Sequence, residues 1–253
     1  MHYSSFQLEL LKRMGIDVWT LRDVEQEKRQ SIQEPVEADN HASAYHHHLE
    51  NDKDTSASGQ LAEDIASLAT QVAQCQKCQL CQSRNNTVFG VGQSPSKWMF
   101  VGEAPGQNED QQGLPFVGRA GKLLDLMIRA LGMERHDVYI ANILKCRPPG
   151  NRDPLPEEIA QCEPYLLRQL DFIKPDVIVA LGRISAQALL RTNQSLGKIR
   201  GQVYHYGDRK TPLIATYHPA YLLRNPEQKS RSWEDLWMAK TVVESSSSTD
   251  VRQ

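Results

Sequence analysis

The sequence has no long apolar run, no dominant charge and few cysteines. No stretch of 18 or more apolar residues occurs, which argues against a membrane-spanning helix. The N-terminus also lacks the basic start and continuous apolar run of a secretory signal peptide, so we expect a cytoplasmic protein. In that reducing compartment the five cysteines are not expected to form disulfides.

The near-neutral charge hides a contrast between the leader and the rest of the chain. The whole chain carries 29 Lys and Arg against 31 Asp and Glu, a net charge of −2. Residues 1–58 hold 6 basic and 11 acidic side chains, whereas residues 59–240 hold 22 and 18. A mildly basic body favours a polyanionic partner only weakly, because many globular domains carry a similar excess.

Composition divides the chain into four segments. Residues 23–58 are rich in Glu, Gln, Ser, Asp and His and poor in apolar side chains, which predicts a disordered acidic linker. Residues 243–253 predict a disordered tail. Residues 1–22 carry apolar side chains at helical spacing but cannot form a core alone, so they must dock on the body or on a partner. Residues 59–242 are the expected globular domain.

Apolar runs alternate with helical patterns through this domain. Buried strands are predicted at 97–101, 137–144, 176–182 and 212–219. Helices are predicted at 61–74, 119–131, 156–172, 184–191 and 230–241. This alternation indicates an α/β fold, a three-layer α/β/α sandwich around a mostly parallel four-stranded sheet. Ligands of such sheets bind beyond the carboxyl ends of the strands.

The loop after the first strand, "GEAPGQNEDQQGLPFVG" at 102–118, combines glycines, carboxylates and one aromatic side chain. Glycine lets a backbone approach a ligand closely, and carboxylates and an aromatic face can bind or position one. The other loops at this edge of the predicted sheet lie at 142–152, 182–185 and 217–224. We therefore expect the functional site where these loops meet.

The cysteines form two pairs that are distant in sequence. Cys75 and Cys78 precede the sheet, whereas Cys146 follows the second strand and Cys162 lies in the next helix. Four thiolates brought together suit zinc or an iron–sulfur cluster, and the wide second pair favours a cluster. Cys81 stands three residues past Cys78 and could serve instead of Cys75. Separate buried thiols are the alternative.

A series of motifs resembles family 4 uracil-DNA glycosylases in order and spacing, over roughly 61–241. The resemblance implies the three-layer fold and a [4Fe-4S] cluster held by Cys75, Cys78, Cys146 and Cys162, with Cys81 outside the ligand set. The motifs that carry it are "CQKC", "VFGVG", "GEAPGQNED", "GLPFVGRAGKLLD", "NILKCRPPGNRDP", "CEPYL", "ALGRISAQALL" and "YHPAYLLRNP".

The same resemblance assigns a pocket for a uracil base flipped out of DNA. Phe116 would stack on the base, Gly102 would let the backbone come close, and Asn142 would read the base edge. His218 would donate to uracil O2 as the glycosidic bond breaks. The alternatives for these residues are a core Phe, a turn-forming Asn and a His that caps the following turn.

The residue that positions the attacking water stays open. The best-known branch of the superfamily has an Asp in this loop, within "GQDPYH", and the present "GEAPG" lacks it. Glu103, Glu109 and Asn151 are the candidates, and the sequence does not rank them. Glu109 is also compatible with a solvated surface turn.

Basic side chains in the same loops predict contacts with DNA phosphates. Lys145, Arg147, Arg152 and Arg224 would neutralise phosphates. Tyr221, Leu222 or Leu223, within "AYLLR" at 220–224, would wedge into the space left by the flipped base. Anchoring of this segment in the core is the alternative.

The sequence thus predicts a monomeric, monofunctional uracil-DNA glycosylase that starts base excision repair on uracil-containing DNA, single- or double-stranded. The alternative is a protein that binds uracil-DNA covalently or tightly without turnover. That branch has an extra His-containing loop, whereas "KCRPPGNRDPLP" here has no His and no insertion. A cluster-bearing structural or redox module would leave Phe116, Asn142 and His218 unexplained.

The leader carries a resemblance of its own. The segment "LLKRMGIDVWTLR" at 10–22 is similar to the N-terminal peptide of the psi subunit of bacterial replicative DNA polymerase, which uses it to bind the chi subunit. This implies a bacterial protein whose residues 1–22 bind a replisome partner, with Ile16, Trp19 and Leu21 as anchors. Docking of this peptide on its own body is the alternative.

Overall fold

The computed structural model describes residues 4–16 and 56–249, and its centre is a six-stranded sheet with the order β1-β3-β2-β4-β6-β5. The four inner strands are parallel, and the edge strands β1 and β5 pair antiparallel to their neighbours. The strands are β1 (Val91–Gly92), β2 (Trp98–Gly102), β3 (Tyr139–Asn142), β4 (Val177–Leu181), β5 (Val203–Tyr206) and β6 (Thr211–Thr216).

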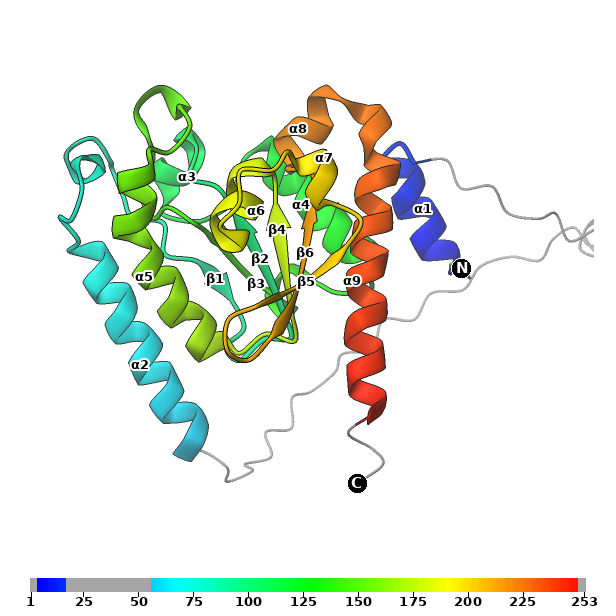
Figure 1. Cartoon of the computed structure of the whole chain (residues 1–253), viewed down its shortest axis with the longest axis horizontal. Helices are drawn as coiled ribbons and strands as arrows, with labels where there is room; N and C mark the ends of the chain where they lie inside the picture. Colours follow the sequence, from blue (N-terminus) through cyan, green and yellow to red (C-terminus); the bar gives the residue numbers. More distant parts are fainter. Residues whose placement is uncertain (1–3, 17–55, 250–253) are drawn as a thin grey trace, which may run out of the picture.

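Helices cover both faces of the sheet and confirm the three-layer α/β/α prediction (Figure 1). Helices α4 and α9 pack on one face, and α5, α6 and α7 pack on the other. The helices are α1 (Ser5–Arg13), α2 (Ser56–Ala73), α3 (Gln107–Gln112), α4 (Arg119–Ala130), α5 (Pro156–Ile173), α6 (Arg183–Leu190), α7 (Leu196–Ile199), α8 (Pro219–Arg224) and α9 (Lys229–Thr249). Short 3-10 helices span Gln79–Gln82, Arg135–Asp137, Pro149–Asn151 and Pro226–Gln228.

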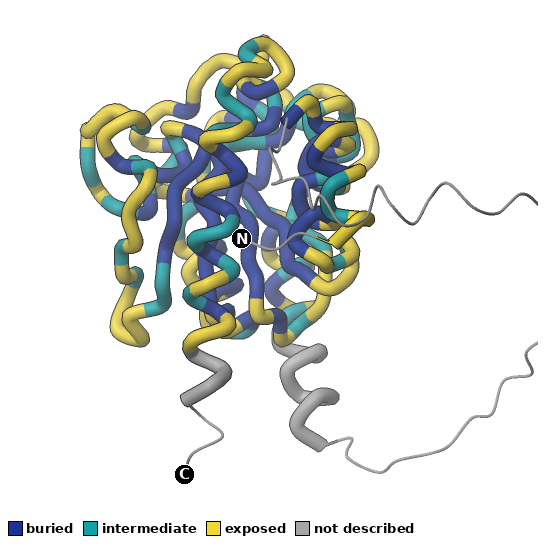
Figure 2. The backbone as a smooth tube through the Cα atoms, turned by 90° about the vertical axis from the view of Figure 1, so that its right-hand side faces the viewer, coloured by how far each residue is buried: buried dark blue, intermediate teal, exposed yellow. Residues whose placement is uncertain are grey.

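The four predicted strands are the four parallel ones. Every residue of β2 and β4 is buried, as expected for inner strands covered on both faces. In Figure 2, buried segments in dark blue run through the middle of the molecule. The edge strands were not predicted, because β1 has only two residues and β5 alternates between exposed and half-buried positions.

The start of the leader docks on its own body. Ser4 caps helix α1 and forms a capping box with Gln7, and the helix lies beside α4 and α9 (Figure 1). Leu10 and Leu11 enter the core cluster on that face of the sheet, and Leu11 is fully buried there. Residues 5–16 therefore follow the docking-on-body alternative. Trp19 and Leu21, and residues 23–55 of the predicted linker, lie outside the described residues.

Two predicted boundaries are wrong. Helix α2 begins at Ser56, inside the predicted linker, and α9 continues to Thr249, through most of the predicted tail. Val243 explains part of the second error, because it is only 8% exposed and extends the apolar face of α9 beyond the predicted helix. Within the described part of the chain, none of the helices is long and apolar enough to cross a membrane.

Candidate active site

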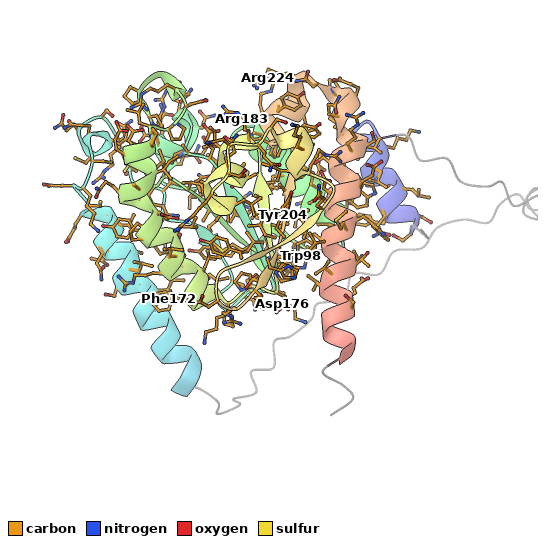
Figure 3. The ribbon with its side chains drawn as sticks, viewed as in Figure 1. Trp98, Phe172, Asp176, Arg183, Tyr204 and Arg224 are labelled. Atoms are coloured by element: carbon orange, nitrogen blue, oxygen red, sulfur yellow. The ribbon has the colours of Figure 1, made fainter. Side chains whose placement is uncertain are left out.

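The predicted functional loops meet at one edge of the sheet. Strands β2, β3 and β4 end there at Gly102, Asn142 and Leu181, and β6 leads to His218. Figure 3 shows Arg183 and Arg224 at this end of the molecule, and Trp98 and Asp176 at the opposite end. The loops enclose a cavity of about 430 Å³ lined by Glu103, Ala104, Pro105, Gly106, Glu109, Phe116, Ala120, Asn142, Pro148, Asn151, Arg152, His218, Ala220, Tyr221 and Arg224.

One wall of the cavity is aromatic. The rings of Phe116 and His218 stack with centroids 5.5 Å apart and planes 29° apart. Phe116 is 6% exposed. A Cβ on Gly102 would lie 2.6 Å from the Phe116 ring and closer still to the Asn142 side-chain oxygen. Only glycine at position 102 therefore leaves room for Phe116 and Asn142 to approach the same backbone.

Asn142 presents an unsatisfied acceptor in this cavity. Its side chain is 2% exposed, and its Oδ1 atom has no hydrogen-bond partner among the described residues. A buried acceptor without a donor costs about 1–3 kcal/mol, so such an atom calls for an explanation. A ligand N–H group would satisfy it.

His218 is held as a neutral donor. Its Nδ1 accepts a hydrogen bond from the backbone N–H of Ala220 at 3.1 Å, which caps α8. Burial lowers the pKa of His218 to about 4, with a further decrease from Arg224. At neutral pH the ring proton is therefore on Nε2. His218 does cap the following turn, as the alternative stated. The same hydrogen bond fixes the tautomer with the proton on Nε2, which lets Nε2 act as a donor.

The three candidates for positioning water differ in the hydrogen bonds that their side chains already accept. The Glu109 carboxylate accepts from the backbone N–H groups of Val117 at 3.0 Å and Gly118 at 3.1 Å. The Asn151 side-chain oxygen accepts from Arg147 Nε at 2.7 Å. Burial raises the pKa of Glu103, and nearby Asp153 raises it further. No hydrogen bond to the Glu103 carboxylate occurs within the described ranges.

The cysteines line a second cavity. All five are free thiols. They line one cavity, next to the segment that follows β3: Cys75, Cys78, Cys81, Cys146 and Cys162. Among the residues that the structure describes, no three His, Cys, Asp or Glu side chains are grouped so as to hold a single metal ion. A cluster attaches each thiolate to a different iron, so its ligands must stand apart around a central volume. Cysteines on the walls of one cavity suit that requirement.

The surroundings of these thiols also suit thiolate ligands. Burial raises the pKa of Cys146 to about 11 and raises those of Cys78 and Cys162. Arg84 Nη1 donates to Cys146 Sγ at 3.1 Å, and the Lys145 backbone N–H donates to Cys162 Sγ at 3.3 Å. Positive charge and N–H donors aimed at sulfur stabilise thiolates. No sequence motif predicts the role of Arg84, because this residue lies outside the cysteine spacing.

Comparison with known proteins decides the family. A model of the uracil DNA glycosylase superfamily matches residues 89–239, more than half of the chain. The chain belongs to this superfamily. The type-4 uracil-DNA glycosylase of Archaeoglobus fulgidus is 44% identical over 179 residues, covering 68% of this chain and 90% of the relative. That of Thermotoga maritima is 44% identical over 180 residues, covering 70% and 93%.

Within the uracil-DNA glycosylase superfamily, the chain belongs to the type-4 family, as its motifs predicted. The type-5 enzyme of Pyrobaculum aerophilum is more distant, 33% identical over 148 residues, which cover 54% of this chain and 63% of that enzyme. The family model begins at residue 89. Helix α1 and the linker lie outside that match.

Two of the residues assigned to DNA contacts in this glycosylase are buried instead. Lys145 is 1% exposed, and its Nζ donates to the Asn142 carbonyl oxygen at 2.8 Å and to Gln169 Oε1 at 2.6 Å. Burial lowers its pKa to about 8. An ammonium enclosed in this way cannot reach a phosphate, so the Lys145 prediction is wrong. Leu222 is also 1% exposed and packs in the core.

Leu222 therefore cannot insert into DNA. It anchors α8 in the core, which is the alternative stated for this segment. Its neighbours Tyr221 and Leu223 are each 36% exposed, and Tyr221 lines the cavity. Arg224 and Arg152 also line the cavity. Arg152 forms an ion pair with the buried Glu158. The hydrogen bond from Arg152 lowers the pKa of the Glu158 carboxyl group.

Proposed function

We propose that the chain is a monofunctional uracil-DNA glycosylase that hydrolyses the N-glycosidic bond of deoxyuridine in DNA. The observation that carries this proposal is the buried, unpartnered Oδ1 of Asn142 beside the Phe116 and His218 rings. A base must leave the DNA helix to enter such a pocket. No lysine is found among the described residues that line it, so no amine is available there for lyase chemistry.

Base selection follows from the side-chain amide of Asn142. Its oxygen accepts from uracil N3–H, and its amino group donates to O4. Cytosine presents the opposite pattern at these two positions and leaves polar groups unpaired, at about 1–3 kcal/mol for each group. Phe116 stacks on the base and closes one side of the pocket.

Cleavage follows from the protonation state of His218. As the glycosidic bond breaks, negative charge builds on uracil O2 and the sugar becomes oxocarbenium-like. The Nε2–H of neutral His218 donates to O2, and this hydrogen bond strengthens as the charge develops. Because Nδ1 is already bound to Ala220, no rotation or change of tautomer is needed.

Water attack on the sugar needs one more polar group. We infer that Glu103 positions this water, because Glu109 and Asn151 already accept hydrogen bonds that hold their own loops. The Glu103 carboxylate is half-buried, and its raised pKa makes it a suitable basic acceptor for the water.

We further propose that Cys75, Cys78, Cys146 and Cys162 hold a [4Fe-4S] cluster, with Cys81 outside the ligand set. Such a cluster would link the segment after α2 to the end of β3 and to α5. Its contribution in this proposal is structural, and the chain's own side chains carry the reaction. Arg147, Arg152 and Arg224 remain the proposed phosphate contacts.

A separate proposal concerns residues 1–22. The resemblance of 10–22 to the psi peptide supports binding of a bacterial replisome partner, which would hold the enzyme near replicating DNA. Because Ile16 is buried on the body, Trp19 and Leu21 are the anchors left for such a partner. A pull-down of chi with the full chain, repeated with Trp19→Ala, tests this idea.

Incubation with single-stranded DNA containing one uracil, followed by alkali, tests the glycosylase function. We expect strand cleavage at the uracil over many turnovers and none with thymine at the same position. A stable protein–DNA adduct without turnover would instead support the covalent-binder alternative. Neither cleavage nor an adduct would reject both.

A further inference from the structure

Phe116 has a backbone conformation that an aromatic residue seldom adopts. Its φ angle is +52°, in the left-handed region where the Cβ atom crowds the following carbonyl. A conformation of this kind costs about 1–3 kcal/mol and persists only where the surrounding structure imposes it. Contacts on either side of Phe116 must therefore hold it.

Before Phe116, the restraint comes from Arg135. Its Nη2 donates to the carbonyl oxygen of Pro115 at 2.6 Å, and its Nη1 donates to Asp125 Oδ1 at 2.7 Å. The Arg135 and Asp125 side chains are each about one-third exposed, so solvent screens the ion pair only in part. The two bonds fix the guanidinium in a fork between α4 and the Phe116 loop.

After Phe116, the restraint comes from Glu109 and Gly121. The Glu109 carboxylate accepts from the next two backbone N–H groups, those of Val117 and Gly118. The first turn of α4 presses against the Phe116 carbonyl at Gly121, where a Cβ would overlap that oxygen. The strained residue is thus held on both sides.

Arg135 does not itself face the proposed uracil pocket. It lines a separate outer groove together with Leu114, Val117 and Asp125, on the far side of the Phe116 loop. Its hydrogen bond to Pro115 connects it to the pocket through the Phe116 loop. This separates it from the residues that touch the substrate.

We propose that Arg135 is a positioning residue for base excision: with Glu109 opposite, it holds the strained Phe116 backbone so that the ring is preorganised for the flipped base. This inference rests on the proposed stacking role of Phe116. A small misplacement of a positioning group lowers a rate by up to about 100-fold, because geometry is lost before the chemical step.

A double-mutant cycle tests the inference in the full chain. We expect Arg135→Met to lower the single-turnover rate of uracil excision by about 10-fold or more. In a Phe116→Ala background the same change should have less than about a twofold further effect, because coupled residues are non-additive. Arg135→Met should also weaken inhibition by free uracil. Arg129→Met is the matched control, since Arg129 makes an exposed pair with Glu134 nearby.

The outcomes distinguish a failure of the Arg135 inference from a failure of the proposed stacking role of Phe116. If Phe116→Ala leaves excision unchanged, the stacking role fails, and the inference with it. If Phe116→Ala slows excision but Arg135→Met has no effect, has an equal effect in both backgrounds, or matches Arg129→Met, only the Arg135 inference is overturned. Should Arg135→Met fail to fold, Asp125→Asn in the same cycle decides, since it removes the charge that holds the Arg135 fork.

Discussion

The Nδ1 atom of His218 accepts the backbone N–H of Ala220, and this one bond sets the chemistry of the ring. With Nδ1 engaged and the pKa lowered to about 4, Nε2 keeps its proton throughout the neutral range. We expect His218→Ala to lower the single-turnover excision rate by about 10²–10³-fold, while DNA affinity changes little, because the lost bond strengthens only in the transition state. Single-turnover kinetics and a binding titration measure the two effects.

The same lowered pKa predicts how stability depends on pH. The unfolded chain takes up the His218 proton near pH 6.5, whereas the folded chain does so only near pH 4. The contribution of neutral His218 to the free energy of unfolding is therefore complete above pH 6.5 and is lost as the pH falls toward 4. Denaturation of the wild type and His218→Ala between pH 4 and 8 measures this difference. An excision rate that titrates near pH 6.5 only when His218 is present would contradict the assignment.

Asn142→Asp tests base reading. The carboxylate can still accept from uracil N3–H but cannot donate to O4, and burying its charge adds a further cost. We expect uracil excision to fall by about 10- to 100-fold and the preference for uracil over cytosine to narrow. Parallel single-turnover assays on DNA with uracil or cytosine at one position measure both changes. An unchanged rate on uracil would show that Asn142 does not read O4.

Conservative substitutions separate the two carboxylates of the loop. In Glu109→Gln the amide oxygen can still accept from Val117 and Gly118, so we expect excision to stay within a few-fold of the wild type. In Glu103→Gln the basic acceptor for water is lost, so we expect a loss of about 100-fold. Single-turnover rates of the two variants, with melting temperatures as a folding control, decide the assignment. The reverse order of effects would make Glu109 the water-positioning residue.

Iron analysis tests the cluster. Protein purified without oxygen should be brown and carry about four iron atoms per chain. Cys162→Ser should lose iron and stability, whereas Cys81→Ser should keep its iron, because four other thiolates complete the site. Colourless protein with one zinc ion per chain would refute the cluster.

The sequence predicted the inner sheet and the pocket better than it predicted the roles of single charged residues. The inner strands are apolar over their full length, so their signal survives without knowledge of the fold. Lys145 follows β3, and its position in a loop at the site predicts a contact with a DNA phosphate. Its partners are the Asn142 carbonyl and Gln169, and Gln169 lies 24 residues further along the chain. Only the folded chain shows that α5 brings this amide to the lysine.

A helical pattern likewise does not say which side chains of a short helix point inward. In α8, Leu222 faces the core, while Tyr221 and Leu223 stay partly exposed. The Arg135 contact was invisible for a related reason, because it joins a 3-10 turn to the carbonyl oxygen of Pro115, 20 residues earlier. Backbone acceptors leave no trace in the sequence.

The packing of α1 predicts that the leader stabilises the domain. Leu11 is fully buried in the cluster that also holds Leu222, so Leu11→Ala should lower the free energy of unfolding by about 2–5 kcal/mol. Phe6 lies on the same helix but is 59% exposed, so Phe6→Ala is the matched control and should change stability by less than about 0.5 kcal/mol. Urea denaturation of the two full-length variants measures the difference. If Leu11→Ala were as stable as Phe6→Ala, α1 would not be docked in solution, and residues 1–16 would be free for a partner.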